Sequence, residues 1–233
     1  MTVDAWLFCT DSTRNESRVA AFLSSDERAR ANRFRFERDR RRYINAHGVM
    51  REILAGYVGV DAASLVITRA ENGKPCLDNQ HRADVQFNLS HSGRYGIVAV
   101  SVGRPVGVDV EAVRADFTWP ELADRYFSRR ENAWLRTLPA DEALRSFFRL
   151  WVAKEAVLKA SGVGLSDALR EVEPPRGDPG STAAYGALFW VSELSISDGY
   201  AAALAVSGAD APALRQVRLD RSPGPCGCAS SDQ

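Results

Sequence analysis

The stretch VGVDVE at residues 106–111 predicts a β-strand with one apolar face and one acidic face. Alternate residues of a strand point to opposite faces, so Val108 and Val110 lie together while Asp109 and Glu111 emerge on the other face. An isolated Asp-x-Glu pair is also typical of a solvated strand face. The apolar neighbours favour instead a central strand, where two like charges are costly unless a cation neutralises them.

A second stretch, WVAKEAVLK at residues 151–159, predicts a largely buried helix on which Glu155 and Lys159 lie one turn apart. The alternative is a surface ion pair worth roughly 0.2–0.5 kcal/mol. The carboxylates of Asp109, Glu111 and Glu155, with the Lys159 ammonium nearby, indicate a site for a hard divalent cation and a phosphate-bearing ligand. Mg²⁺ favours a few carboxylate oxygens, with water and phosphate completing its octahedron.

The composition narrows the class of protein. The 233 residues suffice for one or two domains with a substantial core. Basic and acidic side chains balance to a formal net charge of zero, which argues against a protein that coats nucleic acid. The first residues lack the basic start of a secretory signal, and no apolar run approaches the roughly 20 residues of a membrane span. We therefore expect a cytoplasmic protein without a membrane segment.

The cysteines, at positions 9, 76, 226 and 228, favour free thiols in a reducing compartment over a structural zinc site. Only the last two are close together, and no second pair completes a zinc site. They lie in a Pro-, Gly- and Ser-rich tail, residues 220–233, that we expect to be disordered.

The sequence also contains a duplication. Residues 22–27 and 126–131 share an aromatic and Ser-x-x-Glu pattern at an offset of 104 (126 − 22), and Arg51-Glu52 matches Lys154-Glu155 at 103 (154 − 51). Residues 95–101 resemble residues 200–207. We expect an α+β protein of two similar α/β modules related by a pseudo-twofold, residues 1–104 and 105–219, with the active site in the cleft between them.

Within these modules the patterns predict short strands around longer helices. In the first module we expect strands at 5–9, 65–67, 85–87 and 97–100, with residues 88–92 lying between the last two. A Ser-x-x-Glu helix start is expected at 24–27, and a helix at 43–57 that ends at Gly59. Gly73-Lys74-Pro75 predicts a turn that presents Lys74 as an exposed cation. In the second module, residues 173–183 predict a surface loop.

Residues 28–42 contain eight arginines against Glu37 and Asp39. Arginine without lysine suggests recognition of phosphate or carboxylate groups. A helix face kept soluble by its charge is the plainer alternative, since arginine stems often cover apolar surface. Phe34 and Phe36 lie among the arginines, which leaves single-stranded nucleic acid open as another ligand.

His91 lies in the motif Asn88-Leu89-Ser90-His91-Ser92. A lone histidine is more often a structural hydrogen-bonding group, but this one can donate to a phosphate oxygen or transfer a proton near neutral pH. The chain has no Gly-x-Ser-x-Gly elbow, no phosphate-binding P-loop motif and no dinucleotide-binding fingerprint.

From about Arg30 to Leu165 these motifs resemble the 4′-phosphopantetheinyl transferases, in particular the long, internally duplicated class of surfactin-synthetase-activating enzymes. The matching segments are residues 73–75, 88–92, 107–111, 127–131 and 151–165. The resemblance implies a Mg²⁺-dependent transfer of the 4′-phosphopantetheine group of coenzyme A to a serine of an apo acyl or peptidyl carrier protein, with release of adenosine 3′,5′-bisphosphate. It also implies the fold that the duplication suggests.

The resemblance further implies roles for individual residues. Asp109, Glu111 and Glu155 would hold Mg²⁺, for which Mn²⁺ can substitute. Glu155, Lys159 and His91 would be catalytic, with Glu155 also the base for the serine, directly or through water, and Lys159 on the diphosphate. The coenzyme A-binding set would comprise Arg30, Arg42, Arg69, Gly73, Lys74, Pro75, Asn88, Ser90, His91, Asp109, Glu155 and Lys159. Within that set Arg30, Arg69 and Lys74 match adenosine and 3′-phosphate positions, whereas Arg42, like Arg51 outside it, matches more loosely.

Two other readings compete. A metal-dependent nuclease also uses Asp-x-Glu, a further Glu and a Lys, although its lysine usually lies on an adjacent strand rather than on a helix. A non-catalytic module that binds coenzyme A or a carrier protein is the second. We expect a monomer that binds neither nucleic acid nor membranes, and the sequence leaves the identity of the carrier open.

Overall fold

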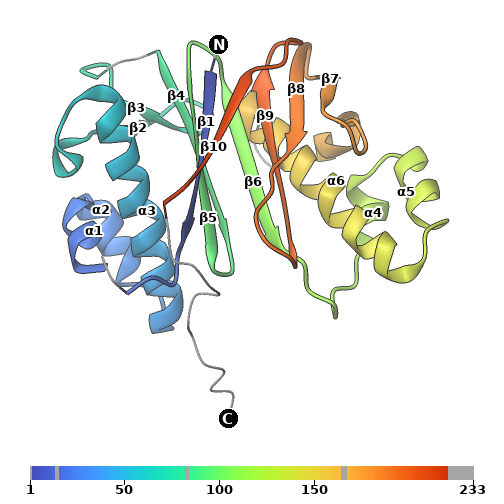
Figure 1. Ribbon diagram of the computed structural model, residues 1–233, viewed down its shortest axis with the longest axis horizontal. Coiled ribbons are helices and arrows are strands. Elements are labelled where there is room, and N and C mark those ends of the chain that lie inside the picture. Colours follow the sequence, from blue (N-terminus) through green and yellow to red (C-terminus); the bar gives the residue numbers. More distant parts are fainter. Residues whose placement is uncertain (1, 14–15, 82–83, 164–166, 220–233) are drawn as a thin grey trace.

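The computed structural model describes residues 2–13, 16–81, 84–163 and 167–219. They form four layers, helices–sheet–sheet–helices, with the two sheets face to face in the middle (Figure 1). This arrangement confirms the α+β fold of two modules. The expected tail, residues 220–233, and Cys226 and Cys228 lie outside the described residues; Cys9 and Cys76 form no disulfide.

The first sheet has the strand order β10-β1-β5-β4, and its helices cover the outer face. A separate hairpin, β2-β3, lies beside it. The elements are β1 (Thr2–Cys9), α1 (Glu16–Phe22), α2 (Ser25–Ala31), α3 (Glu37–Val58), η1 (Ala62–Ser64), β2 (Ile67–Arg69), β3 (Pro75–Leu77), β4 (Val85–Ser92), β5 (Tyr95–Val102) and β10 (Ala213–Arg218).

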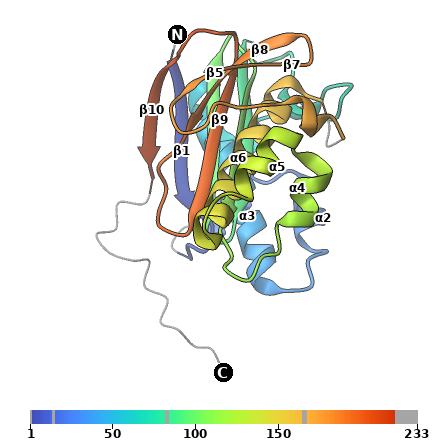
Figure 2. The same ribbon diagram turned by 90° about the vertical axis from the view of Figure 1, so that its right-hand side faces the viewer.

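The second sheet has the order β6-β9-β8-β7, and α6 packs against β6 and β9. Its helices lie on the opposite side of the molecule from α1–α3, as Figures 1 and 2 show. The elements are β6 (Val106–Ala112), α4 (Pro120–Tyr126), α5 (Arg129–Leu135), α6 (Ala140–Ser161), η2 (Asp167–Glu171), β7 (Gly180–Ala184), β8 (Ala187–Glu193) and β9 (Tyr200–Ser207).

The strands divide their side chains between two kinds of core. On β1, the odd-numbered Val3 and Leu7 pack between the sheets, whereas Phe8 packs in the core under α3. On β6, Val108 and Val110 likewise face the space between the sheets. The even positions of β1 and the odd positions of β6 therefore face the helix of their own module.

The duplication is visible in the helices. Both α3 and α6 are 22 residues long. Each ends at a glycine in the left-handed conformation, Gly59 with φ 73° and Gly162 with φ 76°, where a side chain would be strained. Both α2 and α5 begin with a capping box, formed by Ser24 and the Glu27 backbone and side chain in α2 and by its counterpart in α5.

A buried cation repeats as well. Arg51 of α3 lies 3.5 Å from Glu27, and Lys154 of α6 lies 2.9 Å from Glu131, the glutamates being those of the two capping boxes. Each cation also donates to two backbone carbonyl oxygens. Arg51 thus anchors α3 to the surrounding chain. Its guanidinium is fully paired within the first module.

One strand departs from the expected division at residue 104. β10, at the end of the expected second module, lies in the sheet of the first module, parallel to β1. Arg215 of β10 makes a bidentate ion pair with the buried Asp4 of β1, at 2.7 and 2.8 Å. The second module therefore contributes a strand to the first.

Several local expectations need correction. Residues 88–92 are not a connection, because β4 runs through them to Ser92. The strand expected at 65–67 begins at Ile67, α3 begins at Glu37 within the arginine-rich stretch, and the loop expected at 173–183 gives way to β7 at Gly180. β6 is an edge strand of its own sheet rather than a central one. Among the described helices, none is both long and apolar enough to cross a membrane.

Candidate functional site

The two sheets join where β4 runs alongside β6. Because side chains alternate along a strand, Asn88, Ser90 and Ser92 share one face of β4. Their oxygens accept hydrogen bonds from backbone N–H groups of β6, so that polar side chains replace a backbone ladder. The bonds join Val108 to Asn88 (3.0 Å), Val110 to Ser90 (3.3 Å) and Ala112 to Ser92 (3.1 Å).

The same serines hold the acidic residues of β6. Ser90 donates to Asp109 Oδ1 at 2.8 Å, and Ser92 donates to Glu111 Oε2 at 2.8 Å. The Lys159 ammonium reaches in from α6 and lies 2.6 Å from Asp109 Oδ1 and 3.2 Å from Ser90 Oγ. Residues from β4, β6 and α6 therefore meet at one point, on the helix-facing side of β6, as the sequence predicted for the strand and the helix.

Close packing at Gly107 makes this meeting possible. A Cβ at Gly107 would lie 2.1 Å from the carbonyl oxygen of Ala156 and 2.4 Å from the amide nitrogen of Ala160, both in α6. Only glycine allows the backbones of β6 and α6 to approach so closely. The helix that carries Glu155 and Lys159 is thereby seated directly on the strand that carries Asp109.

Glu155 is buried in this cluster, 8% exposed. The pKa of Glu155 is raised to about 7, mainly by burial and to a lesser extent by the negative charge of the nearby Asp109 carboxylate. Burial also raises the pKa of Glu111 above its usual range, against the hydrogen bond from Ser92. Two buried oxygens, Asp109 Oδ2 and Glu155 Oε1, have no hydrogen-bond partner. Crowded carboxylates with unsatisfied oxygens are what a hard divalent cation would relieve.

The described residues contain no group of three Asp, Glu, His or Cys side chains already gathered at metal-ligand distances. The charge of the Asp109 carboxylate is neutralised in this structure by the Lys159 ammonium. The donor set of Asp109, Glu111 and Glu155 fits Mg²⁺ in chemistry and in its unpartnered oxygens, and the assignment of these three as ligands stays a prediction.

Basic side chains extend from this cluster into the first module. His91 is exposed at the end of β4, yet neighbouring atoms desolvate its ring and lower its pKa, and the charges of His47, Lys159 and Arg42 lower it further. His47 stacks on Tyr43 with 4.1 Å between ring centroids. The guanidinium of Arg42 is held by a bidentate ion pair with Asp11, at 2.6 and 3.0 Å.

Beyond His47, this basic side continues to two predicted adenosine and 3′-phosphate positions. The guanidinium of Arg30 lies 5.8 Å from the centre of the Tyr43 ring. The pKa of Tyr43 is raised by burial and by Glu27, while the charges of Arg30 and Arg69 lower it, so both arginines lie within electrostatic range of this ring. Arg69 is exposed and donates to the carbonyl oxygen of Gly73 at 2.8 Å.

The predicted turn at Gly73-Lys74-Pro75 has glycine in the left-handed region, φ 81°. Lys74 is not the free cation that we expected. Its ammonium donates to the carbonyl oxygens of Val106 (3.1 Å) and Ala160 (3.4 Å), at the start of β6 and the end of α6. Burial lowers the pKa of Lys74 to about 8. This turn therefore ties the first module to the second.

Sequence reasoning missed three parts of this site. The sequence predicts no role for Ser92, because its bond to Glu111 follows only once residues 88–92 are a strand. Arg114, two residues beyond the end of β6, has a charge that lowers the pKa of Glu111. Tyr43 and His47, four residues apart on α3, form the stacked pair beside the arginines; helical spacing could have placed them on one face.

The fold has two helix-covered sheets that are joined at a cluster of carboxylates and a lysine beside basic side chains, and this arrangement is suited to a phosphate-bearing ligand. Comparison with known proteins identifies the family. The model of the 4′-phosphopantetheinyl transferase superfamily matches residues 105–205, and that of the 4′-phosphopantetheinyl transferase N-terminal domain matches residues 10–103. The chain belongs to the 4′-phosphopantetheinyl transferase superfamily.

Individual relatives agree. The chain is 39% identical over 209 residues to the 4′-phosphopantetheinyl transferase HetI of Nostoc sp. strain PCC 7120, covering 88% of each chain. It is 32% identical over 155 residues to the 4′-phosphopantetheinyl transferase Sfp of Bacillus subtilis strain 168, covering 66% of this chain and 67% of Sfp. A putative 4′-phosphopantetheinyl transferase of Synechocystis, slr0495, is 35% identical over 154 residues, covering 66% of this chain and 63% of the relative.

Proposed function

We propose that the chain transfers the 4′-phosphopantetheine group of coenzyme A to a serine hydroxyl of an apo acyl or peptidyl carrier protein. The observation that carries the proposal is the cluster of Asp109, Lys159 and Glu155 at the junction of the two modules. Two of its buried carboxylate oxygens lack partners, and basic side chains lie to one side of it. Membership of the superfamily, with 39% identity to HetI, supports the same reaction.

Asp109, Glu111 and Glu155 would hold Mg²⁺, which when bound neutralises negative charge on the diphosphate. Lys159 contributes a second positive charge, held in place by Asp109 and Ser90. A side chain fixed in this way needs little rearrangement when charge develops on a phosphate oxygen. Ser90 therefore acts as a positioning residue rather than as the direct coenzyme A ligand that the resemblance implies.

The nucleotide end of coenzyme A would extend along the basic side chains of the first module. His91 is exposed within electrostatic range of Lys159 and can donate to a phosphate oxygen. Arg30 lies 5.8 Å from the Tyr43 ring and Arg69 lies within electrostatic range of it, and both offer charge for the 3′-phosphate. Arg42 and Lys74 are already paired, with Asp11 and with two backbone carbonyls, so we assign them to the shape of the site rather than to direct phosphate contact.

In the reaction, the serine oxygen of the carrier forms a bond to the β-phosphorus of coenzyme A. The bond from that phosphorus to the bridging oxygen breaks, and adenosine 3′,5′-bisphosphate leaves with the electron pair. Glu155 Oε1, which is buried without a partner, is the acceptor for the serine proton, directly or through one water molecule. Most of the rate enhancement would come from orientation and charge neutralisation.

The test is incubation of the full chain with coenzyme A, Mg²⁺ and a panel of apo carrier proteins, followed by intact-mass measurement. We expect a gain of one phosphopantetheine group on at least one carrier and none on a carrier whose acceptor serine is alanine. No gain on any carrier, together with DNA cleavage under the same conditions, would favour the nuclease reading. Coenzyme A binding without any transfer would favour the non-catalytic module.

The same proposal includes a monomer that acts in the cytoplasm on coenzyme A and carrier proteins, without nucleic acid or membrane partners. The internal repeat already supplies two modules that meet at the site, so a second copy is not required to complete it. Sedimentation of the full chain tests the oligomeric state.

A further inference from the structure

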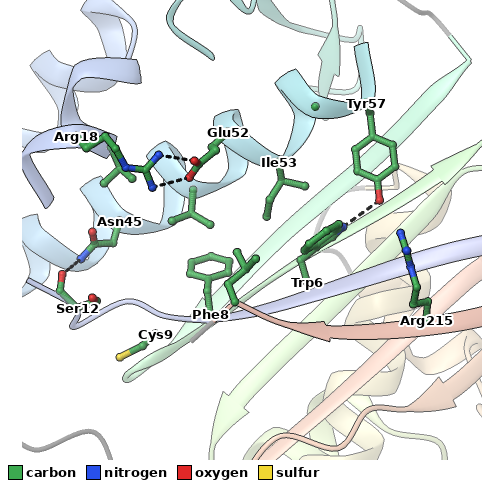
Figure 3. Close-up of a pocket in the computed structure, with 14 residues that line it drawn as sticks. Trp6, Phe8, Cys9, Ser12, Arg18, Asn45, Glu52, Ile53, Tyr57 and Arg215 are labelled. Atoms are coloured by element: carbon green, nitrogen blue, oxygen red, sulfur yellow. Dashed lines mark hydrogen bonds and ion pairs between the residues drawn. The ribbon is translucent and has the colours of Figure 1, made fainter. Parts of the chain in front are cut away.

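A cavity of about 590 Å³ lies on the first module, away from the carboxylate cluster. Figure 3 shows it between α3 and the outer side of β1, with Trp6 and Phe8 along the strand, Ile53 and Tyr57 on the helix, and Arg215 at one end. Its volume is within the range of small-molecule sites, roughly 300–1,000 Å³. The function proposed above gives it no role.

The repeat shows what this cavity corresponds to. An offset of 103 relates α3 to α6 at both ends (140 − 37 and 161 − 58). The same offset maps each of the four acidic and basic residues of the cluster onto a residue that lines the cavity. The pairs are Asp109 and Trp6, Glu111 and Phe8, Glu155 and Glu52, and Lys159 and Gly56.

Strand neighbours confirm the correspondence. β1 has β5 on one side and parallel β10 on the other. β6 has β9 on one side and β4 on the other, bonded to it through side chains. Trp6 pairs with Val98 and Asp109 with Ala203, and these partners are 105 residues apart (203 − 98), like Tyr95 and Tyr200. The cavity is therefore the pseudo-twofold counterpart of the catalytic cluster.

The cavity is lined by apolar groups at three of the four positions where the cluster carries charged side chains. Two aromatic rings, Trp6 and Phe8, replace the two strand carboxylates. Gly56 replaces the ammonium, and a Cβ there would meet nothing within 4 Å, which leaves the helix face open. The one acid that is retained, Glu52, is occupied by a bidentate ion pair with Arg18. The counterpart site thus offers neither a carboxylate cluster for a cation nor a free ammonium for a phosphate.

The polar groups around the cavity satisfy one another. Arg215 is paired with Asp4. The Trp6 indole N–H donates to the Tyr57 hydroxyl at 3.0 Å, and that hydroxyl donates to Asp4. The Trp6 and Tyr57 rings meet edge to face, 6.5 Å between centroids. A charged ligand would have to break one of these pairs, whereas an apolar ligand would only cover aromatic and aliphatic surface.

We propose that this cavity is a second ligand site, which binds an uncharged, largely aromatic or aliphatic small molecule independently of coenzyme A. The two modules thus carry a charged cluster at one of the repeat-related places and an apolar cavity at the other. The ligand would lie along Trp6 and Phe8, with Ile53 above it and Gly56 providing the room.

The test uses the full chain and two fluorescent probes of similar shape. N-phenyl-1-naphthylamine is uncharged, and 8-anilinonaphthalene-1-sulfonate adds a negative charge. We expect saturable binding of the uncharged probe at one site per chain, with the sulfonate at least about tenfold weaker because both guanidinium groups are already paired. Saturating coenzyme A with Mg²⁺ should leave the binding unchanged.

Variants at Gly56 place the site. Gly56→Leu fills the open space and should weaken the uncharged probe at least about tenfold, while Gly56→Ala, the matched control, should bind as wild type does. Gly56→Gln, which brings a polar group into the cavity, gives an independent loss should the leucine variant not fold. Three results would overturn the proposal: no saturable binding, equal affinity for the sulfonate, or displacement by coenzyme A. Binding that survives both Leu and Gln would do so as well.

Discussion

Replacement of Gly107 by alanine tests how α6 is seated on β6. The new Cβ would lie 2.1 Å from the Ala156 carbonyl oxygen, whereas ordinary contact begins at 3.4 Å, so helix or strand must give way by up to 1.3 Å (3.4 − 2.1). The two nearest atoms, the Ala156 carbonyl oxygen and the Ala160 amide nitrogen, belong to the backbone of α6, which cannot rotate aside as a side chain can. Overpacking of this kind costs about 1–3 kcal/mol of unfolding free energy.

The effect on catalysis should exceed the effect on stability. The displaced helix carries Glu155 and Lys159, and a misplacement of about 1 Å at reacting groups can cost about 10²-fold in rate. We expect Gly107→Ala to lower kcat/KM for transfer to the carrier by about that factor while the far-ultraviolet circular dichroism stays native. Intact-mass kinetics give the rate, and urea unfolding gives the free energy.

Gly56→Ala is the control, because it is the same change at the repeat-related helix, where the Cβ meets nothing within 4 Å. It should keep the wild-type rate and gain about 0.5–1 kcal/mol of stability, as alanine does over glycine inside a helix. Wild-type rate and stability in Gly107→Ala would refute the reasoning, and so would an equal loss in Gly56→Ala.

Three further changes test other contacts. Lys154→Met should lower the free energy of unfolding by about 3–5 kcal/mol, since it leaves the buried Glu131 carboxylate without its ion-pair partner. Adding Glu131→Gln should recover part of this loss in urea unfolding. A cost below about 1 kcal/mol for Lys154→Met alone would contradict the buried ion pair. Lys74→Met tests the pH dependence of stability, because burial lowers the pKa of Lys74 to about 8. Between about pH 8 and pH 10.5 the unfolded chain therefore holds a proton that the folded chain lacks. The free energy of unfolding of the wild type should rise relative to that of the variant as the pH increases through this range. A constant or falling difference in urea titrations from pH 7 to 10 would show that the ammonium is not buried. Ser90→Ala removes the donor to Asp109 and the acceptor for Val110 and Lys159; it should cost about 1–3 kcal/mol and slow transfer, and Ser90→Thr should restore the rate if the hydroxyl is what matters.

Much of the fold could be predicted because its signals are local. Alternation in residues 106–111 identifies β6 and its acidic face, and the capping boxes at Ser24 and Ser128 mark helix starts by hydrogen bonds within one turn. The repeat offset then relates the two modules without any knowledge of their contacts. Asp109 and Lys159 meet as expected, because the periodicity of the strand and that of the helix each determine the face on which a side chain lies.

The remainder depends on distant contacts that no local pattern encodes. β10 is largely exposed, and its place beside β1 depends on a partner more than 200 residues away. Residues 88–92 contain small polar side chains typical of a connection, and they form a strand because their oxygens bond to β6. The turn pattern predicts a free Lys74, whereas the start of β6 and the end of α6 each supply a carbonyl oxygen that its ammonium binds.

The most direct test of the catalytic assignment compares two glutamates that the repeat makes equivalent. Glu155→Gln and Glu52→Gln make the same change at positions 103 residues apart (155 − 52), one in the carboxylate cluster and one in the apolar counterpart. Measured as the rate of phosphopantetheine transfer to an apo carrier, Glu155→Gln should lose about 10²-fold or more, and Glu52→Gln should stay close to wild type. Wild-type turnover by a folded Glu155→Gln chain, or an equal loss in both variants, would contradict the assignment.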